Sequence, residues 1–291
     1  DRLNPSILAM LVSSLFIPIV GVLLRVLRQN NEVFTIMFFA GLINCICLWM
    51  VLWFKEKKGA FRTSILHVHL IRGSLGAVGA TCLVYSMKYV QVDLATTVFM
   101  SSPVWSTILA RFWIGEQTNW VTWMAICLGF CGILVSASPG IEGFNIWVLL
   151  LLVPAIVTAL QNTMMTRFNG HGESPWKWSA YNEVVTLVSV FLLWIFLERS
   201  FVDKESVWLY FLVPTVILPI LFLVSYSFLN GKASIVAPLS YLQLPVAAVY
   251  GWLVFNETPE TKTYYGAFLI ILAGLILLLF SKKKQRPHDV T

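Results

Sequence analysis

Long apolar runs alternate with short polar connections along the whole chain. Each run holds about 20 mostly apolar residues, which is the length that an α-helix needs to cross roughly 30 Å of hydrocarbon. The runs do not alternate residue by residue between apolar and polar, as the strands of a membrane barrel would. The pattern therefore predicts ten membrane-spanning helices. They are Ser6–Leu27, Val33–Phe54, Leu66–Met87, Leu94–Trp113, Trp120–Ser138, Asn145–Thr166, Trp178–Leu197, Val207–Leu229, Ser234–Phe255 and Tyr264–Phe280.

The composition excludes an ordinary soluble enzyme. Hydrophobic residues make up 58% of the 291 residues and charged residues 12%, and the mean hydropathy is +0.79. Soluble domains have about 45–50% apolar and about 25% charged residues. Because irregular backbone cannot face lipid, we expect an all-α membrane protein with no separate soluble domain.

The lysines and arginines of the connections predict how the spans are oriented. If the N-terminus is cytoplasmic, the cytoplasmic connections hold thirteen of them: Arg2, Lys55, Lys57, Lys58, Arg62, Arg111, Arg167, Lys177, Lys232, Lys282, Lys283, Lys284 and Arg286. The opposite connections hold six: Arg25, Arg28, Lys88, Arg199, Lys204 and Lys262. Cytoplasmic loops carry the excess, so both termini are predicted to be cytoplasmic. Because these cations are scattered and do not form a stripe, no nucleic-acid partner is expected.

The cysteines and the sequence motifs give no sign of a cofactor or a metal. Each cysteine lies inside an apolar run, where free buried thiols are expected rather than disulfides or a zinc site. They are Cys45, Cys47, Cys82, Cys127 and Cys131. The pair His67 and His69 is two residues apart, so a helix would point the two rings in different directions. The chain contains no Walker loop, dinucleotide fingerprint or HExxH motif.

One pattern occurs once in each half of the chain. The segments Ala95–Pro103 and Ala237–Pro245 have the same length, and Glu116 and Glu257 follow their prolines by 13 and 12 residues. A polar loop and a glycine-containing run come after each glutamate. We predict two repeats of five spans, residues 1–140 and 141–291. Because five is odd, the second repeat inserts with inverted topology, an arrangement that many secondary transporters share.

The repeated Ala, Pro, (Gly/Asn)-Glu and Gly pattern, together with the segment from His69 to Gly73, resembles the drug/metabolite transporter superfamily in its EamA-domain branch. The resemblance covers essentially the whole chain. It implies a secondary transporter rather than an enzyme. Within that branch, residues 69–139, 241–244 and 255–257 are most similar to the S-adenosylmethionine carriers of obligate intracellular bacteria, which implies a multi-pass protein of the bacterial inner membrane.

Two ionisable residues lie inside predicted spans, where a charge is costly and usually functional. Arg72 is in the third span and could attract the carboxylate of a substrate. Glu183 is in the seventh and could hold a substrate cation or a coupled proton. Both could instead reach the cytoplasmic headgroups or pair with each other.

Polar and aromatic side chains within the spans are the other candidates for binding a substrate. They are Tyr85, Thr97, Ser101, Trp105, Gln161, Asn162, Tyr226, Tyr241 and Gln243. Buried amides must find hydrogen-bond partners, either on the solute or on a neighbouring helix, and aromatic faces can attract a cation. Pro103 and Pro245 lie within spans and are expected to kink them at a gate. Gly73, Gly76 and Gly79 are interpreted as helix-packing positions.

We therefore expect a carrier of a small organic solute that works by alternating access, with its site between the third, fourth, sixth, eighth and ninth spans. The preferred solute from the resemblance is S-adenosylmethionine or another amino-acid-like or nucleoside-linked zwitterion. An exporter of amino acids or aromatic metabolites is the main alternative, and a channel or an integral-membrane enzyme is more remote. A coupled proton, a counter-substrate and a homodimer stay open as partners.

Overall fold

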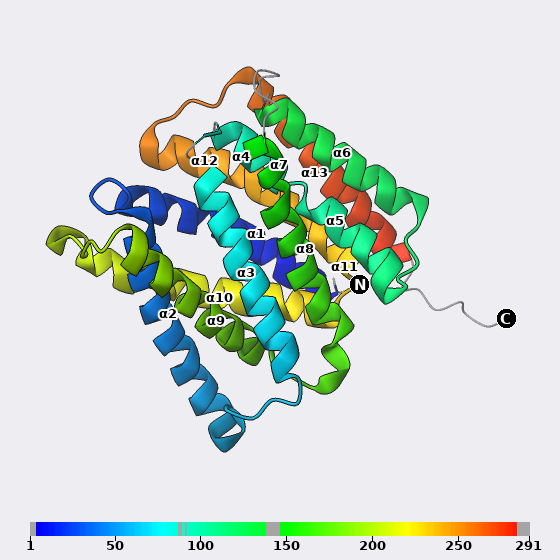
Figure 1. Cartoon of the computed structure of the whole chain (residues 1–291). Coiled ribbons are helices and arrows are strands. Elements are labelled where there is room, and N and C mark those ends of the chain that lie inside the picture. Colours follow the sequence, from blue (N-terminus) through cyan, green and yellow to red (C-terminus); the bar gives the residue numbers. More distant parts are fainter. Residues whose placement is uncertain (1–3, 87–88, 91, 138–145, 284–291) are drawn as a thin grey trace.

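The computed structural model describes residues 4–86, 89–90, 92–137 and 146–283, and these residues form a bundle of helices without strands (Figure 1). The helices are α1 (Pro5–Leu27), α2 (Val33–Glu56), η1 (Lys57–Gly59), α3 (Leu66–Ser86), α4 (Val92–Phe99), α5 (Ser102–Leu109), η2 (Ala110–Ile114), α6 (Trp120–Ala137), α7 (Ile146–Leu150), α8 (Leu152–Arg167), η3 (Asn169–His171), α9 (Pro175–Leu197), η4 (Lys204–Ser206), α10 (Val207–Asn230), α11 (Ala233–Leu239), η5 (Ser240–Leu242), α12 (Gln243–Phe255) and α13 (Thr261–Lys283). The all-α prediction is confirmed for this part of the chain. Several positions named in the sequence analysis lie outside the described residues. They are the expected helix ends Met87, Ser138 and Asn145, the repeat boundary at residues 140–141, and the cations Arg2, Lys88, Lys284 and Arg286.

Within the part of the chain that the structure describes, three of the runs that were expected to be continuous are interrupted. The interruptions separate α4 from α5, α7 from α8, and α11 from α12. A proline follows each one, and these prolines are Pro103, Pro154 and Pro245. A proline offers no N–H to the carbonyl four residues earlier, and its ring clashes with that carbonyl. Accordingly, α4 ends at Phe99 and α7 at Leu150, while Tyr241 lies in the 3₁₀ turn η5.

Among the described residues, six helical segments are long and apolar enough to cross a membrane. They are Pro5–Leu27, Val33–Glu56, Pro175–Leu197, Lys204–Asn230, Ala233–Phe255 and Thr261–Phe280. Helix α3 is not among them, because it carries His67, His69, Arg72 and three glycines within 21 residues. The interrupted segments α4–α5 and α7–α8 are also absent from this set. The chain is thus a multi-pass membrane protein, and the count of ten spans remains a prediction.

The contacts between helices come in matched pairs that agree with the predicted repeat. The predicted repeat pairs α1 with α7–α8, α2 with α9, α3 with α10, α4–α5 with α11–α12, and α6 with α13. Under this pairing, the contact of α1 with α10 in one direction corresponds to the contact of α8 with α3 in the other. In the same way α2–α10 matches α9–α3, and α1–α12 matches α8–α5. Three further contacts, α6–α13, α2–α9 and α5–α11, each join two corresponding helices. Figure 1 shows α6 and α13 side by side.

The Gly/Asn-Glu pattern has a structural cause at the helix ends. Gly115 follows η2 with φ 81°, and Asn256 follows α12 with φ 55°, both in the left-handed region. Glycine and asparagine tolerate this conformation better than other residues. In both places the next amide closes the helix end: that of Glu116 donates to the Ala110 carbonyl, and that of Glu257 to the Gly251 carbonyl. The two glutamates therefore start from matching backbone positions.

The cysteines are free, and they are less uniformly buried than expected. Cys45 is buried, whereas Cys127 and Cys131 on α6 are exposed on the outside of the bundle. Cys47 and Cys82 are half-buried. An exposed thiol on an apolar helix of a membrane protein can face lipid, so burial in protein is not needed to explain its position in an apolar run.

Candidate functional site

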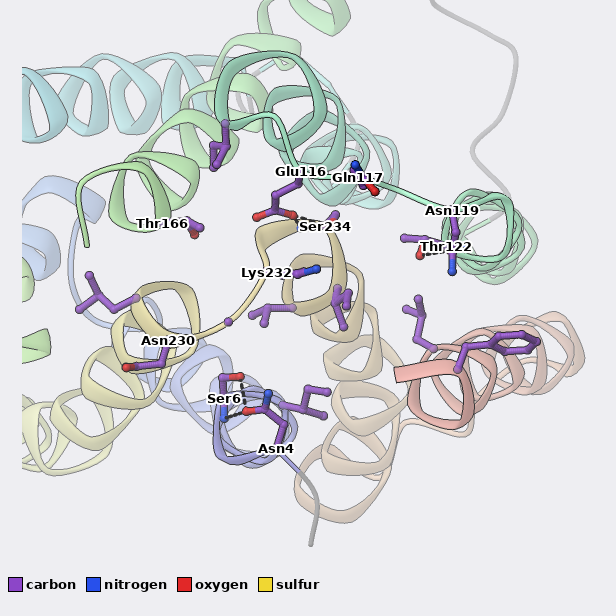
Figure 2. A pocket seen from close by; sticks show the side chains of 18 of the residues that line it. Asn4, Ser6, Glu116, Gln117, Asn119, Thr122, Thr166, Asn230, Lys232 and Ser234 are labelled. Atoms are coloured by element: carbon purple, nitrogen blue, oxygen red, sulfur yellow. Dashed lines mark hydrogen bonds between the residues drawn. The ribbon is translucent and has the colours of Figure 1, made fainter. Parts of the chain in front are cut away.

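A cavity of about 810 Å³ lies at the end of the bundle where α1 begins, here called the cavity end. Its walls come from the ends of α1, η2, α6, α8, α10, α11 and α13 (Figure 2). The lining combines apolar side chains with amides, hydroxyls and three charged groups. The polar residues are Asn4, Ser6, Glu116, Gln117, Asn119, Thr122, Thr166, Arg167, Asn169, Asn230, Lys232 and Ser234. Apart from Asn230, which the sequence offers as a hydrogen-bonding group next to the eighth span, none of these was singled out from the sequence as a binding residue, because each lies at or beyond the end of an apolar run.

The floor of this cavity is the largest cluster of buried side chains. Ile7, Leu229, Val236 and Leu277 line the cavity and also belong to that cluster. Trp178, which is fully buried, lies in the same cluster. The cavity end of the bundle is therefore sealed below the cavity by packed apolar groups.

Glu116 links the two predicted repeats at the cavity end. Its carboxylate accepts hydrogen bonds from the backbone amides of Ala233 and Ser234 at 2.9 and 3.1 Å, and from the Ser234 hydroxyl at 2.6 Å. Figure 2 shows the Glu116 side chain pointing at Ser234 on the first turn of α11. These amides have no partner within the helix, and a carboxylate also suits the positive end of the helix dipole.

Glu257, the counterpart of Glu116, has a different partner at the opposite end of the bundle. It accepts a hydrogen bond from the Arg25 guanidinium at 2.6 Å, and both side chains are about half exposed. Arg25 also lies 4.2 Å above the ring of Phe255. The guanidinium holds the pKa of the Glu257 carboxyl below its usual range, chiefly through this hydrogen bond. This pair joins α1 to the end of α12.

Arg72 and Gln161 hold α3, α8 and α9 together. Arg72 is 7% exposed, and its guanidinium donates to the carbonyls of Gln161 at 3.1 Å and Trp178 at 3.0 Å, with the Met165 sulfur 3.7 Å away. Gln161 in turn donates to the Arg72 carbonyl at 2.8 Å and to the Asn182 side chain at 3.1 Å. No carboxylate pairs with Arg72 among the described residues. Arg72 and Gln161 were both predicted as binding candidates from the sequence, but their contact with each other was not predicted.

The glycines after Arg72 allow α3 to approach its neighbours closely. A Cβ atom on Gly73 would lie 2.4 Å from a Val185 side-chain atom, and one on Gly76 would lie 2.5 Å from the Gln161 amide nitrogen. At Gly79 the nearest atom would be a Val157 methyl at 3.1 Å. This stripe packs α3 on α8 and α9, in agreement with its interpretation from the sequence.

A second group of candidates lies at the interruptions of α4–α5 and α11–α12. The Trp105 indole donates to the Ser101 hydroxyl at 3.2 Å, and the Gln243 amide lies 3.4 Å from the sulfur of Met100. Thr97 is also buried there. Tyr241 is 1% exposed, and a Cβ on Gly129 would lie 2.6 Å from its ring, so the ring packs tightly on α6.

The remaining candidates are Tyr85, Tyr226 and Asn162. Tyr85 lies 6.0 Å from Trp147 between ring centroids, near the end of α3 that is far from the cavity. Tyr226 stacks on Phe222 at 6.0 Å. Asn162 is half-buried on α8. The aromatic candidates are thus spread over both ends of the bundle.

Glu183 lies between α9 and α2. Its carboxylate accepts a hydrogen bond from the Asn44 amide at 3.0 Å. Neither Glu183 nor Arg72 belongs to an ion pair within the described residues. The two side chains therefore do not pair with each other, which was one of the alternatives expected from the sequence. Asn44 could have been noticed as an amide within an apolar run.

A buried charge cluster at the cavity end was missed from the sequence. Lys177 lies on the first turn of α9 and pairs with Glu56 at 2.8 Å and Glu173 at 3.4 Å. Its ammonium also donates to the Arg62 carbonyl at 3.0 Å. Ser174, the N-cap of α9, donates to Glu56, and Thr63 donates to Glu173 at 2.7 Å. Glu56 and Lys177 are far apart in the sequence, so no local pattern predicts the cluster.

Comparison with known proteins identifies the family. Residues 4–138 and 145–280 each match the EamA-like transporter family. The chain belongs to this family. It is a transporter and not an enzyme, and it contains two copies of the EamA domain.

The relatives of this EamA protein transport different small metabolites. A protein of Rickettsia bellii named S-adenosylmethionine uptake transporter is 30% identical over 92% of this chain and 91% of its own length. A riboflavin transporter of Vibrio cholerae is 26% identical over 79% of this chain and 77% of its own. A solved crystal structure has the same fold, with a TM-score of 0.78, 13% identity, and coverage of 97% of this chain and 99% of the other. These findings establish a transporter of small metabolites.

Proposed function

We propose that this EamA protein carries S-adenosylmethionine, or a zwitterion of the same kind, across the bacterial inner membrane by alternating access. The proposal includes ten spans in two inverted repeats, with both termini and the cavity end on the cytoplasmic side. The observation that carries it is the 30% identity to the Rickettsia bellii uptake transporter over nine-tenths of both chains. The matched helix contacts support two halves that can move about a common site.

The environment of Arg72 supports a substrate with a carboxylate. A guanidinium has five N–H donors, and the three contacts of Arg72 use three of them. All three acceptors are neutral, so the positive charge is kept inside the bundle without a carboxylate among the described residues. A buried charge is stabilised best by an opposite charge with good hydrogen-bond geometry. The amino-acid carboxylate of S-adenosylmethionine supplies such a group.

The helix interruptions support a binding region for the rest of the solute. Phe99 and Tyr241 precede prolines by four residues, so their carbonyls lose the amide partner that another residue would provide. Together with Trp105, Ser101 and Gln243, these groups offer carbonyl dipoles, an aromatic face and hydrogen-bond donors and acceptors. Aromatic faces and carbonyl oxygens both suit the sulfonium cation. Glu183 is proposed as a site for a coupled proton.

Uptake into proteoliposomes tests this function. Labelled S-adenosylmethionine is expected to enter liposomes with the purified protein at a saturable rate, and unlabelled S-adenosylmethionine inside is expected to accelerate its entry by counterflow. Liposomes without protein and an Arg111→Gln variant, altered at an exposed residue outside the cavity lining, serve as controls.

The same assay separates the alternatives. Riboflavin, amino acids and aromatic metabolites are tested as competitors and as labelled solutes. Transport of one of these without transport of S-adenosylmethionine overturns the proposed substrate, and counterflow measured in both directions distinguishes uptake from export. Fast, non-saturating flux without counterflow would indicate a channel and contradict alternating access.

A further inference from the structure

The two glutamates at the ends of η2 and α12 occupy matching positions but have different partners. Glu116 binds the first turn of α11 in the other repeat. Glu257 binds Arg25 near the end of α1. Both glutamates follow a left-handed residue, and their amides bond the carbonyls of Ala110 and Gly251, each six residues earlier. The two partners are therefore two arrangements available to a carboxylate at this kind of helix end.

Arg25 itself has a counterpart at the cavity end. Arg25 precedes the start of α2 at Val33 by eight residues, and Arg167 precedes the start of α9 at Pro175 by eight. The contact of α1 with α12 corresponds to the contact of α8 with α5. By this correspondence, the position of Arg167 on α8 relative to the end of η2 is equivalent to the position of Arg25 on α1 relative to the end of α12. Arg167 is exposed and lines the cavity that Glu116 also lines.

We propose that Glu116 is a switch residue that exchanges partners, leaving the first turn of α11 for Arg167 when the cavity end opens. In the present sealed state Glu116 fastens η2 to α11, beside the buried cluster that forms the cavity floor. In the open state the Glu116–Arg167 pair is the equivalent of the present Arg25–Glu257 pair. The exchange rests on the proposed alternating access, and it assigns to Arg167 a role in stabilising the open state.

Such an exchange costs little free energy, because the Glu116 carboxylate has hydrogen-bond donors in both states. In the sealed state Glu116 receives three hydrogen bonds, and in the open state a charge-assisted pair with an arginine replaces them. The pair is exposed to water, so it stabilises the open state only modestly. A small difference between two satisfied states allows a carrier to populate both.

Two substitutions are expected to move this equilibrium in opposite directions. Ser234→Ala removes one of the three bonds of the sealed state and leaves both amides, so the open state gains population. Arg167→Gln removes the partner of the open state, so the sealed state gains population. Arg111→Gln removes a cation from η2 at the same end without touching the cavity and is the matched control.

Labelling of one buried cysteine measures the equilibrium. Ala237 on α11 is 3% exposed and belongs to the buried cluster that forms the cavity floor. The substitution Ala237→Cys is made in a protein whose five native cysteines have been replaced. A membrane-impermeant thiosulfonate, applied from the cavity side, should react about two- to fivefold faster in Ser234→Ala and about two- to fivefold slower in Arg167→Gln. Arg111→Gln should label at the parent rate.

The proposal is overturned if Arg167→Gln labels at the parent rate, or if both variants shift in the same direction. Labelling requires no solute, so failure of S-adenosylmethionine transport does not affect this result. Conversely, a protein that transports S-adenosylmethionine but shows unchanged labelling in Arg167→Gln keeps its proposed function and loses the switch.

Discussion

Replacing Gly266 by alanine is expected to separate α6 from α13 and to destabilise the protein by about 1–3 kcal/mol, the usual cost of overpacking. A Cβ atom on Gly266 would lie 2.5 Å from the Gly132 carbonyl oxygen and 2.5 Å from the Ser136 Cβ. These atoms belong to the backbone or lie next to it, so no side-chain rotation can relieve the clash. The melting temperature in detergent measures the loss.

Gly21 on α1 provides the matched control for that substitution. No atom of the described residues lies within 4 Å of a Cβ atom built on Gly21, which is exposed and lies six residues before the end of α1. Gly21→Ala should leave the melting temperature unchanged or raise it, because alanine favours a helix over glycine by up to about 1 kcal/mol. Equal melting temperatures of the two variants would contradict the close approach of α6 and α13.

Replacing Arg72 by glutamine is expected to lower both stability and affinity for the solute. Two hydrogen bonds from a charged donor to the Gln161 and Trp178 carbonyls are lost, and each such bond contributes about 1.5–3 kcal/mol. If the guanidinium also binds a substrate carboxylate, the affinity for S-adenosylmethionine should fall at least about tenfold, which corresponds to about 1.4 kcal/mol. The shift in melting temperature produced by the solute measures that affinity.

A comparison of two ligands separates binding from a structural role. S-adenosylmethionine and its decarboxylated analogue are compared on the parent protein and on Arg72→Gln. The parent should prefer the carboxylate form, and the variant should lose that preference. Gln161→Met is the matched control, because it removes the bonds to the Arg72 carbonyl and to Asn182 but keeps the cation. A variant that is less stable but keeps the preference shows that Arg72 only joins helices.

The helix breaks and the close helix contacts are largely readable from the sequence. A proline inside an apolar run can interrupt the helix one turn earlier by covalent geometry, as at Pro103 and Pro245, whereas Pro18, Pro214 and Pro219 lie within the continuous helices α1 and α10. A small-residue stripe such as Gly73, Gly76 and Gly79 permits close approach in any bundle. The sequence did not predict the third interruption before Pro154, although the same rule applies there.

The hydrogen-bond partners of the candidate residues could not be predicted in this way. Arg72 was singled out because a charge in an apolar run is costly, but its acceptors are backbone carbonyls of α8 and α9, which every residue possesses. Likewise, no local pattern joins Glu116 to Ala233, which is 117 residues away. Such contacts depend on the relative position of helices, which hydropathy does not encode.

The sequence by itself determined that this is a helical membrane protein with a duplicated pattern, because apolar length and proline or glycine positions act within one helix. The position of each glutamate directly after the fourth span of its repeat is also visible in the sequence, where Gly115 and Asn256, residue types that tolerate a left-handed turn, precede it. Only the tertiary structure decided that Glu116 binds α11 while Glu257 binds Arg25. That choice depends on which helix ends lie within about 3 Å of each carboxylate, and packing between distant segments sets those distances.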